Sequence, residues 1–67
     1  MTEIIDHTKK NFQNGRFPVN EIEFIEQGTG EFPDYQINCR NEEIHIFRCS
    51  CVLMFEIEDG ITYLRVK

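Results

Sequence analysis

The stretch RCSCVLMFEIEDG, residues 48–60, decides the fold because it ends in a strong turn signal. Asp59-Gly60 suits a two-residue type I′ turn, which requires positive φ at both central positions. Such a turn joins two antiparallel strands and determines which side chains share a face. The pairs predicted on the apolar face are Ile57 with Thr62, Phe55 with Leu64, and Leu53 with Val66. The pairs predicted on the other face are Glu58 with Ile61, Glu56 with Tyr63, and Met54 with Arg65.

A second hairpin is predicted directly upstream, in YQINCRNEEIHIF, residues 35–47. A two-residue turn at Asn41-Glu42 would oppose Arg40 to Glu43, which is a favourable charge pair. The apolar face of this hairpin would then hold Cys39 with Ile44 and Ile37 with Ile46. The other face would hold Asn38 with His45 and Gln36 with Phe47.

The alternation of side chains has to reverse between these two hairpins if both apolar faces are to meet in one core. A turn centred on Cys49-Ser50 would produce the reversal, and so would a β-bulge that bends one long strand. Either device places Ile44, Ile46, Leu53 and Phe55 beneath the sheet. It leaves a second apolar surface on the opposite side, made of Phe47, Val52, Met54, Ile61 and Tyr63. A helix over residues 42–58 is the rival interpretation, and the β-branched and aromatic residues there favour strands.

The N-terminal residues have a different pattern. In residues 1–15, Thr2 can cap a short helix, Glu3 and Asp6 fall in its first turns, and Gly15 can end it. From residue 22 onward the apolar residues alternate with glutamates, which is typical of a half-buried strand. We therefore predict one α+β domain over residues 1–67, with a short N-terminal helix packed on an antiparallel meander of about five strands in residues 19–67. The alternative is an all-β fold with a disordered N-terminus.

Negative charge is concentrated in the middle of the chain. The formal net charge is −5, and no Lys or Arg occurs between Arg16 and Arg40. The acidic residues in that interval are Glu21, Glu23, Glu26, Glu31 and Asp34. Direct nucleic-acid binding is disfavoured because phosphate contacts need a basic surface. The carboxylates serve either solubility and protection of a strand edge or recognition of a basic groove on a partner protein.

The three cysteines do not form a recognisable site. An odd number of cysteines without an export signal favours a reducing, cytoplasmic location, and no segment is long and apolar enough to cross a membrane. Cys49 and Cys51 lack the spacing of a common zinc knuckle and of a redox Cys-x-x-Cys motif. Cys39 and His45 are predicted on opposite faces, so they could not share an ion. We therefore expect no metal, no cofactor and no enzymatic activity.

The leading functional hypothesis is a small, non-enzymatic binding protein. Its apolar surface would form a homodimer, the commonest kind of assembly. Its acidic segment would occupy a basic nucleic-acid-binding site on a partner enzyme and inhibit that enzyme. In size and charge the chain is similar to phage-encoded antagonists of host defence. The alternatives are a metal-stabilised binding module that uses Cys49 and Cys51, and a structural subunit of a larger assembly.

Overall fold

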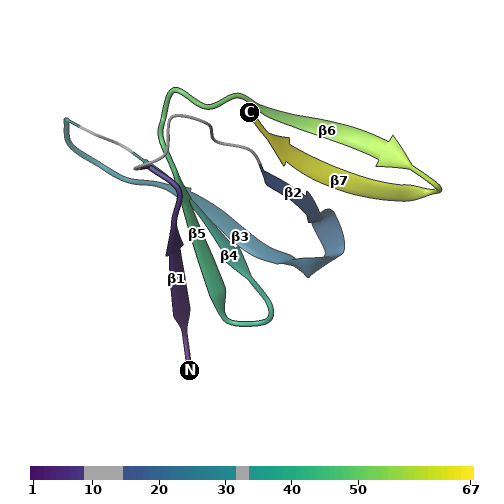
Figure 1. Ribbon diagram of the computed structural model, residues 1–67, viewed down its shortest axis with the longest axis horizontal. Helices are drawn as coiled ribbons and strands as arrows, with labels where there is room; N and C mark the ends of the chain where they lie inside the picture. The colour runs from purple at the N-terminus through teal and green to yellow at the C-terminus, as the bar shows by residue number, and fades with distance from the viewer. Residues whose placement is uncertain (9–14, 32–33) are drawn as a thin grey trace.

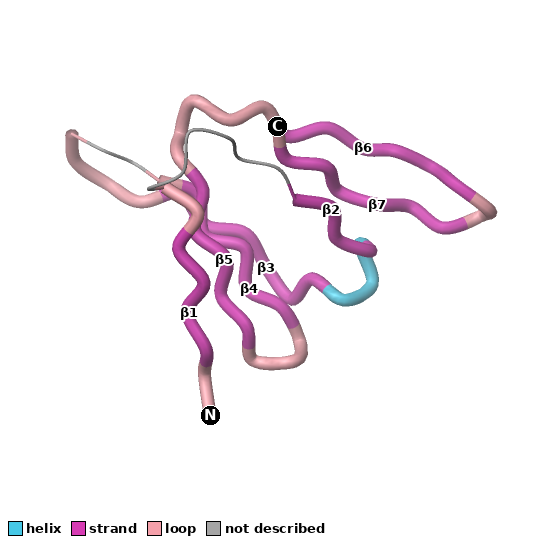
Figure 2. Tube along the Cα trace, in the orientation of Figure 1, coloured by secondary structure: helices cyan, strands magenta, loops and turns pink. Residues whose placement is uncertain are grey.

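The chain forms two β-sheets that share one small core (Figures 1 and 2). The computed structural model describes residues 1–8, 15–31 and 34–67. Of these residues, 61% lie in strands and 5% in a single 3₁₀ turn. The elements are β1 (Glu3–Asp6), β2 (Gly15–Pro18), η1 (Val19–Glu21), β3 (Ile22–Gln27), β4 (Tyr35–Cys39), β5 (Glu43–Phe47), β6 (Leu53–Glu58) and β7 (Ile61–Val66).

The four-stranded sheet has the order β1-β5-β4-β3, and the three-stranded sheet has the order β2-β7-β6. The strands pair antiparallel except β1, which runs parallel to β5. Each sheet therefore contains strands from both halves of the chain, which a simple meander would not produce.

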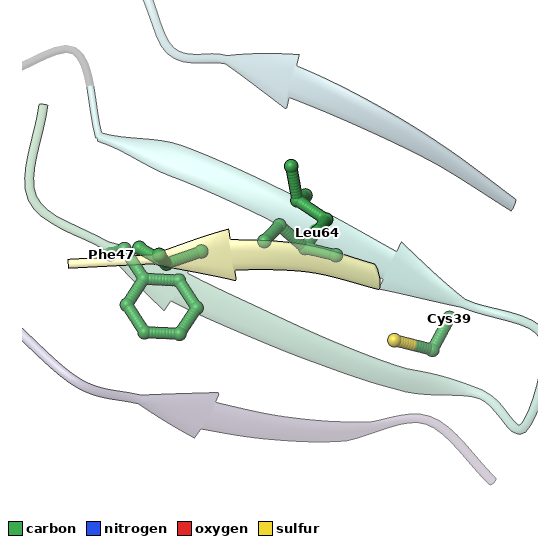
Figure 3. Close-up of a cluster of buried hydrophobic side chains, with 5 residues drawn as sticks. Cys39, Phe47 and Leu64 are labelled. Carbon is green, nitrogen blue, oxygen red and sulfur yellow. The ribbon is translucent and has the colours of Figure 1, made fainter. Parts of the chain in front are cut away.

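Both sheets contribute to the core where β7 crosses the four-stranded sheet (Figure 3). The buried residues are Ile37 and Cys39 from β4, Phe47 from β5, and Leu64 and Val66 from β7. The partly buried residues that pack around them are Phe17, Ile22, Tyr35, Cys51 and Leu53. A domain of this size is expected to have a free energy of unfolding of about 3–10 kcal/mol. The burial of each core side chain is therefore a substantial part of the total stability.

The predicted N-terminal helix is wrong, and the fold is β rather than α+β. Glu3–Asp6 forms β1, in which Ile4 pairs with Ile44 and Ile5 pairs with His45. Two consecutive β-branched isoleucines favour a strand, and the partner strand lies 40 residues away, beyond the reach of local helix signals. Residues 9–14 of the predicted helix lie outside the described residues. The all-β alternative has the correct class, but its disordered N-terminus is also wrong at β1.

The hairpin formed by β6 and β7 is confirmed in full. The observed pairs run from Leu53 with Val66 to Glu58 with Ile61 without a register shift. Asp59 has φ of 53° and Gly60 has φ of 78°, as a type I′ turn requires. The Asp-Gly signal therefore determined both the turn and the register.

The predicted register of the hairpin formed by β4 and β5 is wrong by one residue. Asn38 lies opposite Ile44 and Ile37 lies opposite His45. The loop has three residues and ends at Glu42, whose φ is 70° and whose N–H donates to the Cys39 carbonyl over 3.1 Å. Three-residue hairpin loops place a left-handed residue at this position. The shift turns Phe47 toward the core and sends Ile44 and Ile46 to the opposite face.

The predicted reversal around Cys49-Ser50 is also wrong, because β5 and β6 do not belong to the same sheet. Residues 48–52 connect the two sheets, and the Cys51 N–H closes a turn on the Arg48 carbonyl over 3.0 Å. The proposed core set is therefore divided. Leu53 packs on the core, whereas Phe55 is 72% exposed.

Candidate functional site

The five predicted carboxylates gather along one border of the four-stranded sheet. Glu21 ends η1, Glu23 and Glu26 lie in the edge strand β3, Glu31 lies in the loop that follows, and Asp34 precedes β4. Asp34 is half-buried and the other four are exposed. We call this set of five residues the acidic edge.

The carboxylates of the acidic edge form no ion pairs in the part of the chain that the structure describes. In contrast, two carboxylates of the other sheet are both paired. Glu56 accepts a hydrogen bond of 2.6 Å from Arg65, and Glu58 accepts one of 2.8 Å from Arg16.

Glu21 and Glu23 do not lie on the same strand. Glu21 belongs to the 3₁₀ turn, and the register of β3 shifts between Ile22 and Phe24. A bulge of this kind bends an edge strand and interrupts its ladder. The carboxylates consequently follow a curved border instead of a straight row.

A groove of about 160 Å³ lies beside the acidic edge. Phe24, Asn38 and Ile44 contribute to its lining, together with Arg40 and Glu23. The Asn38 Nδ2 atom is buried and has no hydrogen-bond partner among the described residues. A buried donor without an acceptor costs about 1–3 kcal/mol.

The predicted apolar surface is divided between two sheets. Phe47 is fully buried in the core because of the register shift. Val52, Met54 and Ile61 are 57%, 41% and 45% exposed, and Tyr63 is half-buried with the Arg16 guanidinium 3.8 Å above its ring. These four residues belong to the β6–β7 hairpin or adjoin it, and Phe47 does not extend their patch.

The prediction that Cys39 and His45 lie on opposite faces is wrong, because the shifted register places both on the inner face of the four-stranded sheet. Burial raises the pKa of the Cys39 thiol, and the charges of Glu43 and Glu21 raise it further. A thiol in this environment stays protonated, so it is a poor nucleophile and a poor metal ligand.

The cysteines of the connecting segment lie in different environments. Cys49 is exposed, and Cys51 is half-buried against the core. Burial raises the pKa of the Cys51 thiol, although a hydrogen bond and the charge of Arg48 act in the other direction. Across residues 1–8, 15–31 and 34–67, no three His, Cys, Asp or Glu side chains are grouped so that they could hold a metal ion.

A polar chain that the sequence analysis missed connects β1 to β5. His7 Nε2 lies 3.0 Å from His45 Nδ1, and His45 Nε2 lies 3.4 Å from Glu43 Oε1. The His7 ring also stacks on Phe47, with 4.4 Å between ring centroids. The spacing Glu43-x-His45-x-Phe47 placed these side chains on one strand face and was the available signal. A protonated imidazole only donates, so the bond between the rings exists while at least one ring is neutral.

Acid is expected to destabilise the fold through two carboxylates outside the acidic edge. A hydrogen bond from Asn41 lowers the pKa of Glu43, assisted by one from His45, and the hydrogen bond from Arg65 lowers the pKa of Glu56. A lowered pKa in the folded state contributes stability above the unfolded pKa of about 4.3. That contribution is lost as the pH falls through the folded value.

The melting temperature should therefore fall as the pH is lowered from about 5 to about 3. Thermal unfolding followed by circular dichroism across this range measures the effect. The double variant Glu43→Gln/Glu56→Gln should have a flatter profile. A double variant whose profile parallels that of the wild type would contradict this assignment.

Comparisons with known proteins give no relative for this chain: no family model, no curated protein and no solved structure matches it. In the described part of the chain, no helix has the length and apolar character needed to cross a membrane. The function of the chain is therefore inferred from the surfaces described above.

Proposed function

We propose that this chain is a non-enzymatic binding protein whose acidic edge occupies a basic site on a partner protein. The observation that supports the proposal is that the five carboxylates form no ion pair with any described residue, because carboxylates that already have partners would gain little from a basic surface. Complementary charge accelerates association and orients the two proteins.

The groove beside β3 supplies the non-electrostatic part of this interaction. Phe24 is 46% exposed and lies next to Asn38, whose amide donor needs an acceptor. Apolar contact in the middle of a charged rim is the usual arrangement of a protein–protein interface.

The basic site of the partner would be one that otherwise binds nucleic acid, since proteins that bind phosphate backbones carry clustered Lys and Arg. The chain would then act as an inhibitor by excluding the nucleic acid. Its three free thiols suit a reducing compartment such as the cytoplasm.

The double variant Glu23→Lys/Glu26→Lys tests this proposal. Immobilised wild-type protein and the variant are exposed to the same native lysate, and the bound proteins are identified and their affinities measured. We expect the variant to bind the captured partner at least about tenfold more weakly at low ionic strength, because it replaces attraction by repulsion. We also expect the affinity of the wild type to fall as salt is added.

The matched control is Glu3→Lys, which reverses one exposed carboxylate on β1, at the opposite border of the same sheet. This variant should retain the partner. A partner that binds the wild type and the double variant equally would refute the proposed site. Addition of nucleic acid should release the captured partner. A complex that does not dissociate when nucleic acid is added would refute the proposed inhibition.

A further inference from the structure

The outer border of β6 is open in the described part of the chain, because β6 is the last strand in the order β2-β7-β6. Next to it, Val52 and Lys67 exchange both backbone hydrogen bonds, over 2.8 and 3.0 Å. Hydrogen-bonded and non-hydrogen-bonded pairs alternate along an antiparallel ladder. Every second residue of β6 therefore directs its N–H and C=O groups away from β7. These residues are Leu53, Phe55 and Ile57.

Two of these three residues, Phe55 and Ile57, carry the most exposed apolar side chains of the hairpin. Phe55 is 72% exposed and Ile57 is 77% exposed, although both lie on the face that Leu53 presents to the core. Figure 1 shows the reason: the turn between β6 and β7 extends away from the four-stranded sheet, so this sheet covers only the base of the hairpin. The molecule exposes 4925 Å², against roughly 4450 Å² for a typical monomer of its mass.

The features that normally keep a strand edge from pairing are missing from β6. Its sequence, LMFEIE, contains no Lys and no Pro, and its pairing with β7 has no bulge. Its two carboxylates already have partners, since Glu56 is bonded to Arg65 and Glu58 to Arg16. The edge strand β3 differs on both counts, because its pairing with β4 has a register shift and its carboxylates form no ion pair among the described residues.

We propose that β6 pairs with β6 of a second copy, antiparallel about a two-fold axis at Phe55. The residues with outward backbone groups then meet one another. Phe55 faces Phe55 of the partner subunit, and Leu53 faces Ile57 of the partner subunit. On the other face of the new sheet, Glu56 lies opposite Met54 of the partner subunit. Two three-stranded sheets become one continuous six-stranded sheet.

The neighbouring registers are less favourable. A shift of two residues in one direction places Glu56 opposite Glu56 of the partner subunit, and directly opposed like charges destabilise a sheet. A shift in the other direction places Ile57 opposite Cys51 of the partner subunit, which lies outside β6. The register centred on Phe55 is the one that uses the whole strand. A second copy is thus the occupant that fits this edge, and the acidic edge on the other sheet stays available for a different protein.

Sedimentation velocity across a concentration series tests the association. The wild type should sediment as a dimer, and Phe55→Lys should raise the dissociation constant by more than about tenfold, because it opposes two ammonium groups at the axis. Phe55 is exposed, so the substitution spares the core, and circular dichroism verifies that the variant is folded. The matched control is Ile4→Lys, at an equally exposed strand position of the other sheet, and it should remain a dimer.

Disulfide trapping tests the register. In a background with Cys49→Ser and Cys51→Ser, the Phe55→Cys variant should form a covalent dimer on mild oxidation. Directly opposed, hydrogen-bonded residues have Cα atoms about 5.5 Å apart, which a disulfide can span. Met54→Cys should not cross-link in the same background. A monomeric wild type, a dimer that Phe55→Lys leaves intact, or faster cross-linking at residue 54 than at residue 55 would each overturn the proposal.

Discussion

Replacement of Phe47 by alanine should unfold most of the protein. The Phe47 side chain is fully buried, and it contacts His7, directly after β1, and Phe17 of β2 as well as the core. Phe→Ala changes in cores cost about 3–5 kcal/mol, which is comparable with the whole free energy of unfolding expected for a domain of this size. Urea denaturation followed by far-ultraviolet circular dichroism should show a much lower midpoint, or no folded baseline.

Phe55→Ala is the matched control, because it removes the same atoms from a side chain that is 72% exposed. Its effect on the unfolding of the monomer should be within about 0.5 kcal/mol. The two variants also distinguish the observed fold from the sequence prediction. The prediction placed Phe55 in the core and Phe47 on the opposite surface, whereas the structure has the reverse. Similar costs for both substitutions, or a larger cost for Phe55→Ala, would contradict the observed β4–β5 register.

Replacement of Gly60 by valine should have the second largest effect. Gly60 has φ of 78°, and the left-handed region costs an ordinary residue about 1–2 kcal/mol and suits a β-branched one worst. The turn also determines the register of β6 and β7, and with it the positions of Leu64 and Val66 in the core. The melting temperature should fall by about 4–8 °C for each kcal/mol by which the free energy of unfolding decreases.

The control for this variant is Thr62→Val, which adds the same side chain two residues later at an exposed strand position. Valine is favourable in a strand, so the melting temperature should change little. An unchanged melting temperature for Gly60→Val would mean that the turn adopts a different conformation in solution.

The sequence predicted the two hairpins with different success, and the reason lies in their loops. Asp59-Gly60 has a strong local preference for positive φ, so the β6–β7 register followed directly. In the β4–β5 hairpin the left-handed residue is Glu42, a residue type with no such preference. The local pattern favoured a charge pair across a two-residue turn, and the resulting error of one residue moved Phe47 out of the predicted core.

The remaining fold errors involve pairing between distant segments. The neighbour of β1 is β5, and the neighbour of β2 is β7. Local capping signals at Thr2 and Gly15 favoured a helix because nothing in residues 1–15 reveals a strand partner some 40 residues away. Non-local pairing overrides weak helix propensity in such cases.

The sequence predicted which residues form the acidic edge, but it did not predict how they are arranged in the fold. The run of acidic residues between Arg16 and Arg40 identified the acidic edge, since charge is read directly from the chain. The groove at Asn38 and the exposed border of β6 depend on the arrangement of the sheets, so the sequence pattern did not reveal them. That the acidic edge forms no ion pair with the described residues depends on where the arginines lie in the fold, which the sequence does not show.

The pairing of β2 with β7 has a consequence for synthesis on the ribosome. Gly15 finds its neighbour Val66 only after some fifty further residues have been translated, and β1 likewise waits for β5. A nascent chain that ends before β7 contains all four strands of the four-stranded sheet but lacks the strand that pairs with β2, so Phe17 has no neighbouring strand to support it. Because distant contacts of this sort slow folding, the early strands would emerge with their apolar side chains uncovered, and holdase chaperones that bind extended segments would have time to engage them.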